Sequence, residues 1–166
     1  RLQCPSVVVR RGTYERVGSF ETSLRYAIDW EMWIRIAASH AVAYLTDALA
    51  SYRIHSGAET RRVKSSGIAT RDLALALSYI RRTLARADRL DCFSSAQRFA
   101  LNFSRQAAYE AEAGNDWEAA AGEIAASIRY MATTMSLRDC LWHIRWYLKL
   151  RLNLQAIRER ARIAGR

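Results

Sequence analysis

The sequence of 166 residues has little of what turn-rich and disulfide-rich proteins depend on. One proline and seven glycines argue against a sandwich or barrel built from many short strands. Cys4, Cys92 and Cys140 lie far apart and show no Cys-x-x-Cys spacing, so we expect neither a disulfide framework nor a zinc site. No apolar run approaches the roughly 20 residues that cross a bilayer, so no transmembrane helix is expected.

The remaining composition is that of a globular protein, with 51% hydrophobic and 25% charged residues. Sparse free cysteines favour a reducing compartment, and we expect a cytoplasmic location. The chain begins at Arg1 without a methionine, in sequence typical of the interior of a domain, so we expect a fragment of a longer protein.

Positive charge accumulates toward the C-terminal end of the chain. Residues 1–60 carry seven basic and six acidic residues, and residues 61–136 carry eleven and eight. Residues 137–166 carry eight basic and two acidic residues, which is more than half of the net charge of +10. The distribution of polar and apolar residues also divides the chain. The stretch at 56–66 is polar and basic, and it is the best candidate for a domain boundary.

The first 60 residues predict a short mixture of strands and helices. Short β-branched or apolar runs predict strands at 6–9, 41–45 and 49–54. Helices are expected at 10–18, where Gly18 would end the helix, and from Asp29 onward, where apolar residues recur on one helical face.

Residues 61–166 predict an all-helical extension. Leu73, Leu77, Ile80 and Leu84 form a stripe at helical spacing within a helix at 71–86. Two further helices, starting at Ser94 or Ser95 and at Trp117, should form an antiparallel hairpin with small residues at their contact. These are Ala107, Ala108, Ala111, Ala120, Ala121 and Ala125. A last helix at 137–162 is expected from its strong helix formers, although residues 148–154 alternate as a strand would.

Three motifs in the first 60 residues occur in an order that suggests a family. They are Arg-Arg-Gly-Thr-Tyr-Glu-Arg-Val-Gly-Ser-Phe at 10–20, Asp-Trp-Glu-Met-Trp-Ile-Arg at 29–35 and Ala-Ser-Tyr-Arg-Ile-His at 50–55. Together they resemble the second half of the catalytic domain of family 2 glycosyltransferases, which have the GT-A fold. The resemblance implies that residues 1–60 are a short, incomplete α/β remnant of a GT-A domain. Together with the helical extension at 61–166, it leads us to expect a mostly α chain.

The resemblance implies that Asp29 is the base that takes a proton from the acceptor hydroxyl in an inverting sugar transfer. The alternative is that Asp29 is simply a helix N-cap, a position that aspartate favours. Glu31 matches the second acid of the family motif, or is a solvated acid favoured by the helix dipole. Where the family usually has a glutamate before the base, this chain has Ile28.

Further residues match positions that would contact substrate. Trp30 could stack on a sugar ring, whereas Trp33 fits a place in the core better. Arg35 could pair with a diphosphate or with an acid, the alternative being a surface ion pair. Gly18 could let the backbone approach a sugar, or could end a helix. Arg10 or Arg11 could meet a phosphate, although an ordinary solvated charge fits Arg11 better.

The resemblance also implies a divalent metal, Mn²⁺ or Mg²⁺, in the full-length protein, with His55 helping to hold it. The alternative for His55 is a structural or surface role. No Asp-x-Asp motif, whose carboxylates would hold that cation, occurs in residues 1–166. We therefore expect this chain alone to be inactive, and the longer protein to move a sugar from a nucleotide-sugar donor to a glycan or lipid-linked acceptor.

The basic segment at 141–162 mixes Trp, Tyr and Leu with Arg and Lys, as helices in a membrane interface do. It could bind an anionic surface, giving a peripheral position at the inner membrane face, or could dock its apolar residues on the other helices. No nucleic-acid motif accompanies the charge, so nucleic acid is not an expected partner. The rival to the transferase hypothesis is a non-catalytic, basic helical adaptor that binds a protein or an anionic membrane.

Overall fold

The computed structural model describes residues 4–51, 53, 68–132 and 135–164. A short 3₁₀ turn, η1 (Cys4–Ser6), precedes the helices α1 (Arg11–Val17) and α2 (Ile28–Ser39). The later helices are α4 (Ile68–Arg86), α5 (Phe93–Ala113), α6 (Trp117–Met131) and α7 (Leu137–Ala164), with a 3₁₀ turn, η2 (Leu90–Cys92), before α5. The described chain is therefore mostly helical, as the sequence predicts.

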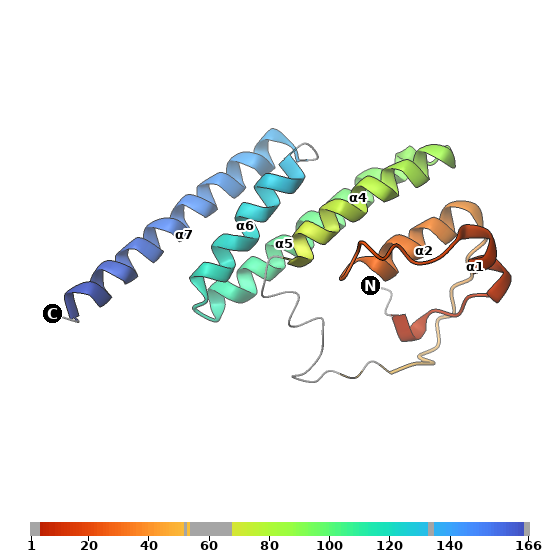
Figure 1. The fold of residues 1–166 in the computed structure, drawn as a ribbon, viewed down its shortest axis with the longest axis horizontal. Coiled ribbons are helices and arrows are strands. Elements are labelled where there is room, and N and C mark those ends of the chain that lie inside the picture. Colours follow the sequence, from red (N-terminus) through yellow and green to blue (C-terminus); the bar gives the residue numbers. More distant parts are fainter. Residues whose placement is uncertain (1–3, 52, 54–67, 133–134, 165–166) are drawn as a thin grey trace.

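The helices are arranged in a row from one end of the molecule to the other. Figure 1 shows α1 and α2 at one end, α4 and α5 beside them, and α6 and α7 at the opposite end. The helix α7 is the outermost, and its neighbour along its length is α6. The long helices α4 to α7 thus form an antiparallel array, and α2 packs against α4.

The strands expected at 6–9, 41–45 and 49–54 do not form in the part of the chain that the structure describes. Residues 4–6 form the turn η1, and residues 41–51 have no regular structure and are exposed. Val8 is 99% exposed and Tyr44 is 80% exposed, so nothing described covers these segments. A strand needs a neighbouring strand for its backbone groups, and β-branched residues alone do not supply one.

The predicted helical stripe is confirmed as the centre of one apolar cluster. Leu73, Leu77, Ile80 and Leu84 of α4 are all buried and pack with residues of α5. Leu24 and Ala27, which precede α2, belong to the same cluster. The core therefore crosses the predicted boundary at 56–66 and joins the start of α2 to the helical array.

A second cluster joins α5, α6 and α7. The antiparallel hairpin of α5 and α6 is confirmed, with Ala107, Ala108, Ala120 and Ala121 buried at the contact. Small side chains let two helices approach closely, and α7 covers the pair with Trp146, Leu150 and Leu154. The expected serine cap of α5 is wrong: the helix begins at Phe93, and the Ser95 hydroxyl accepts a hydrogen bond from Arg98 at 3.0 Å.

A buried polar chain ties together the three central helices. The hydroxyl of Thr70 on α4 lies 2.9 Å from that of Ser104 on α5, and it also donates to Glu123 on α6. These three side chains are almost fully buried. Hydrogen bonds are directional, so this network of side chains fixes how α4, α5 and α6 are placed relative to one another.

Candidate active site at the start of helix α2

The start of α2 is positioned by a carboxylate from another helix. Asp72 of α4 is buried and accepts the backbone N–H groups of Tyr26 and Ala27, each at 2.7 Å, and that of Arg25 at 3.1 Å. Backbone N–H groups before and within the first turn of a helix have no intrahelical partner, so an outside carboxylate stabilises them. Asp72 thereby fixes the backbone immediately before Asp29.

Asp72 was not among the residues that sequence reasoning selected. Its partners are backbone groups that lie 45 to 47 residues earlier in the chain, so no local pattern reveals them. A signal was nevertheless present. Asp72 lies between Ala69, Leu73 and Ala76 on the apolar face of α4, and an acid on such a face needs a partner.

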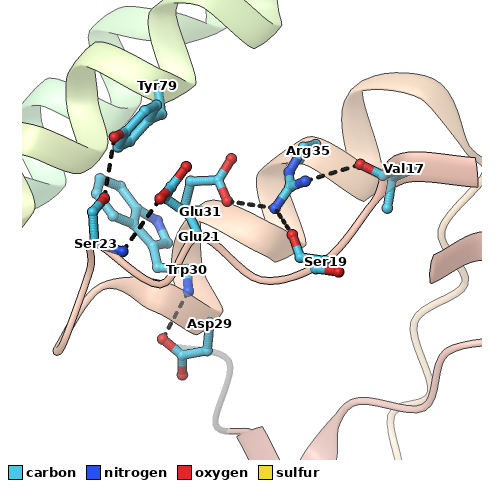
Figure 2. Close-up of polar contacts among 9 residues, drawn as sticks. All are labelled: Val17, Ser19, Glu21, Ser23, Asp29, Trp30, Glu31, Arg35 and Tyr79. Atoms are coloured by element: carbon cyan, nitrogen blue, oxygen red, sulfur yellow. Dashed lines mark hydrogen bonds and ion pairs between the residues drawn. The ribbon is translucent and has the colours of Figure 1, made fainter. Parts of the chain in front are cut away.

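Asp29 is the second residue of α2 and is half-buried. Its carboxylate oxygen Oδ1 accepts the backbone N–H of the next residue, Trp30, at 2.7 Å. The expected alternative, an N-cap role, is wrong: the N-cap residue is Ala27, and no side chain caps α2 there. Figure 2 shows the carboxylate of Asp29 pointing away from the polar cluster of Glu31 and Arg35.

Asp29 lines a cavity of about 310 Å³ at the junction of α2, α4 and α5. Its aromatic walls come from Tyr26, Trp30, Trp33 and Phe99. Asp29 is the acidic residue among the described side chains that line the cavity. The volume is at the lower end of the range for small-molecule sites, and one carboxylate among aromatic rings is a composition that suits an oriented polar ligand.

The two tryptophans contribute to this cavity in different ways. The ring of Trp30 packs on Phe99 of α5, with centroids 4.9 Å apart, so Trp30 also belongs to the core. The rings of Trp33 and Phe20 form a T-shaped pair with their centroids 6.1 Å apart. The indole Nε1 of Trp33 is buried, and no acceptor for it occurs in the described residues. A buried donor without an acceptor is costly.

Glu31, Arg35 and the loop around Gly18 form a separate polar cluster (Figure 2). Glu31 is 3% exposed, and its Oε2 pairs with Nη2 of Arg35 at 2.9 Å. The Arg35 guanidinium also donates to the carbonyls of Val17 and Ser19, both at 2.9 Å. The expected picture of Glu31 as a solvated acid is therefore wrong, and of the alternatives for Arg35 the structure shows the pair with an acid.

Gly18 lies between the two carbonyls that Arg35 binds. Its φ of +87° falls in the region that glycine adopts readily, and its N–H ends α1 by donating to Tyr14 at 2.9 Å. The helix-ending role expected as an alternative is thus confirmed. Arg35 holds this loop against α2, and the same loop carries Phe20 to the edge of Trp33.

The loop that continues from Phe20 to α2 is also anchored to α4. The hydroxyl of Ser23 lies 3.1 Å from that of Tyr79, and the N–H of Ser23 donates to the carboxylate of Glu21 at 3.2 Å. Hydrogen bonds from Ser23 lower the pKa of Glu21 below its usual value, which keeps this exposed acid ionised. The loop therefore has polar anchors at both ends.

The remaining predicted site residues are not brought to the cavity by the described contacts. Arg10 is exposed and precedes α1, where its carbonyl accepts the N–H of Thr13 at 2.9 Å. His55 lies outside the described residues. In the described ranges no three His, Cys, Asp or Glu side chains gather as metal ligands would. The divalent cation stays a prediction.

Comparison with family models, with curated proteins and with solved structures found no match for this chain. The resemblance to family 2 glycosyltransferases therefore depends on the sequence motifs at 10–20, 29–35 and 50–55 alone. The structure places Asp29, Trp30 and Trp33 at one cavity, and it places Glu31, Arg35 and Gly18 in a separate polar cluster.

Proposed function

We propose that this chain is the acceptor side of a GT-A, family 2 glycosyltransferase, with Asp29 as the catalytic base. The observation that carries the proposal is that Asp29 lines the aromatic cavity together with Trp30 and Trp33. In the longer protein, a hydroxyl of a glycan or lipid-linked acceptor would give its proton to Asp29 as its oxygen bonds to the anomeric carbon of the donor sugar. The nucleoside diphosphate leaves from the opposite face, so the configuration inverts.

The state of Asp29 differs from that of the other acids nearby. Glu31 is buried against a guanidinium, and Asp72 is occupied by backbone N–H groups. The described partner of Asp29 is one backbone N–H at Oδ1, so Oδ2 has lone pairs available to an entering hydroxyl. A base must first be able to reach the proton that it takes, and Asp29 is the acid of this region that the cavity exposes.

The supporting residues fit the same proposal. Trp30 and Trp33 line the cavity and offer flat ring faces on which a sugar could stack. Arg35 and Asp72 are positioning residues: Asp72 holds the backbone just before Asp29, and Arg35 holds the loop at Gly18 against α2. The donor site would come from the Asp-x-Asp half, which residues 1–166 lack.

The experiment is the substitution Asp29→Asn in the full-length protein. Asparagine keeps the size and the acceptor for the N–H of Trp30 but cannot take a proton, so kcat should fall about 100-fold or more. Turnover is measured as nucleoside diphosphate release from a panel of nucleotide sugars with acceptor present, and donor binding is measured separately by calorimetry. Donor affinity should stay unchanged.

A matched control is Asp116→Asn. Asp116 also accepts a backbone N–H at the start of a helix, that of Ala119 at 3.0 Å, but it is exposed on α6 and far from α2 in the chain. Its substitution should leave turnover unchanged. Near-normal turnover in Asp29→Asn would show that Asp29 is not the base, and the cavity would then be only a gap in the packing of the core.

A further inference from the structure

The outermost helix, α7, has an apolar stripe on the side that the described residues leave uncovered. Its members recur at steps of three or four residues, so they share one helical face. They are Leu137, Leu141, Ile144, Leu148 and Leu152, each between 42% and 77% exposed. The inward face of the same helix is a different row, with Trp146, Leu150 and Leu154 buried against the hairpin of α5 and α6. The helix thus has two apolar faces, of which only one is used in the described fold.

Basic side chains accompany the uncovered stripe. The helix α7 carries seven basic and two acidic residues. Both acids are already neutralised: Asp139 pairs with Arg105 of α5, and Glu159 pairs with Arg162 at 2.6 Å. Helical spacing places Arg145 on one flank of the stripe and Arg151 on the other. An apolar strip with cations along both edges is typical of helices that lie in a membrane interface.

A groove lies alongside this stripe, between α5 and α7. Its volume is about 920 Å³, and Arg138, Arg145 and Lys149 line it together with the aromatic rings of Tyr109 and Trp142. Trp142 is 37% exposed, and Tyr109 is 50% exposed. One acid, Glu112, also lines the groove, but it already binds Lys149 and the indole of Trp146, each at 2.9 Å. The groove therefore favours an anion.

We propose that α7 binds the surface of an anionic phospholipid bilayer and lies flat on it. The stripe from Leu137 to Leu152 enters the boundary of the acyl chains, and the groove at Arg138 and Arg145 takes a lipid phosphate. Trp142 lies at the level of the headgroups, where tryptophan is favoured. None of the described helices is long and apolar enough to cross a bilayer, so the contact is with the surface. The proposal is independent of the transferase proposal.

Other occupants fit the stripe less well. A second copy of the chain would bring two helices of the same strong positive charge together, which is repulsive. A nucleic acid would pair with the arginines but would have no use for five exposed apolar side chains between them. An anionic bilayer satisfies both features with one surface.

The test is sedimentation of the full chain with vesicles of phosphatidylglycerol and phosphatidylcholine, and with vesicles of phosphatidylcholine alone. We expect binding to the anionic vesicles that weakens as salt is raised above about 0.1 M. The substitution Leu148→Asp should weaken binding about tenfold or more, because it places a charge in the stripe. The pair Arg145→Gln and Arg151→Gln should weaken it by about 30-fold, since each basic residue near such a surface contributes about fivefold.

Matched controls make the same kinds of substitution on another helix, so that an effect of the position on α7 can be distinguished from an effect of the change in charge or hydrophobicity alone. Leu75→Asp changes an exposed leucine on α4, and the pair Arg81→Gln and Arg86→Gln removes the same charge from α4. Both should bind the anionic vesicles as the unchanged chain does. Circular dichroism confirms that each variant is folded, which is expected because every substituted side chain is exposed.

Three results would overturn the proposal. The first is the absence of binding to anionic vesicles at low salt. The second is binding that the Arg145 and Arg151 pair weakens but Leu148→Asp does not, because charge alone would then explain it, as it would for a nucleic acid. The third is a dimer in sedimentation velocity that Leu148→Asp disrupts while vesicles fail to bind, which would assign the stripe to a second copy.

Discussion

The two outer helices, α2 and α7, are attached to the central helices in different ways. The approach to α2 is held by a carboxylate: Asp72 binds the N–H groups of Arg25, Tyr26 and Ala27, and Arg35 ties the helix to the loop at Gly18. The helix α7 has an apolar row along its inward face, which includes the fully buried Leu150, and ion pairs to α5 and α6 flank that row.

The difference corresponds to what each helix is proposed to do. Hydrogen bonds to a carboxylate are directional and fix position within a few tenths of an ångström, whereas apolar burial is non-directional. The helix that carries the proposed base, Asp29, is oriented by directional bonds at its start. The helix that carries the proposed membrane surface needs only to be held by one face, and its other face stays free.

The largest expected effect tests the apolar attachment of α7. Leu150→Ala should lower the free energy of unfolding by about 3 kcal/mol, because the side chain is fully buried and its removal leaves a cavity. Urea unfolding followed by circular dichroism measures the change.

The control for this prediction is on the same helix. Leu148→Ala changes a side chain that is 55% exposed on the opposite face, so it should change stability by less than about 0.5 kcal/mol. Equal effects of the two substitutions would mean that both faces of α7 are covered in solution, and the contrast between its faces would fail.

The next effect tests the polar attachment of α2. Asp72→Ala should cost about 2 kcal/mol, because it leaves three backbone N–H groups without their acceptor. Hydrogen exchange should accelerate at the amides of Arg25, Tyr26 and Ala27 while the amides of α7 keep their protection. Asp91→Ala, which removes an exposed acid in η2, should do neither.

A different pattern of exchange would break the comparison. If Asp72→Ala accelerates exchange in α7 as much as at residues 25–27, Asp72 supports the whole fold and not the attachment of α2 in particular. The proposed catalytic geometry would then have no anchor of its own.

The helical part of the fold could be predicted because its signal is local. The stripe from Leu73 to Leu84 repeats at helical spacing within one segment, and all four of its members are buried. The strand expected at 41–45 failed for the opposite reason. A strand depends on a partner elsewhere in the chain, and the exposed side chains of Val42 and Tyr44 show that no described segment supplies one.

The candidate site also has a part that local sequence patterns predict and a part that depends on distant residues. The motif identified Asp29 and its neighbours Trp30 and Trp33 from short-range spacing, and the structure places all three at one cavity. The anchor Asp72 was missed because its partners lie far away in the chain and are backbone groups. The partners of Arg35 could be predicted from the sequence only in part. The pair with Glu31, four residues earlier, follows from helical spacing, whereas the hydrogen bonds to the carbonyls of the loop at Gly18 do not.

The smallest expected effect is a pH dependence located in α7. His143 is fully buried, its Nδ1–H donates to the carbonyl of Asp139 at 2.7 Å, and its Nε2 has no partner among the described residues. Burial lowers the pKa of His143, and the nearby Arg105 guanidinium lowers it further, against the opposing effect of Asp139. The unfolded chain therefore takes up the proton first, so stability is complete above a pH of about 6.5 and is lost as the pH falls below it.

The slope of this loss approaches about 1.4 kcal/mol per pH unit for one proton. His143→Asn keeps a donor for the Asp139 carbonyl and cannot be protonated, so its stability should stay level between pH values of about 6.5 and 5. The carboxyl pKa values of Asp139 and Glu112 are lowered by their hydrogen bonds, so these acids affect stability only at lower pH. The free energy of unfolding of both proteins is measured by urea unfolding between pH values of about 6.5 and 5. If the unchanged protein and His143→Asn show the same pH dependence, the protonated His143 is tolerated in the folded state, and the inward face of α7 is more accessible to water than its apolar row implies.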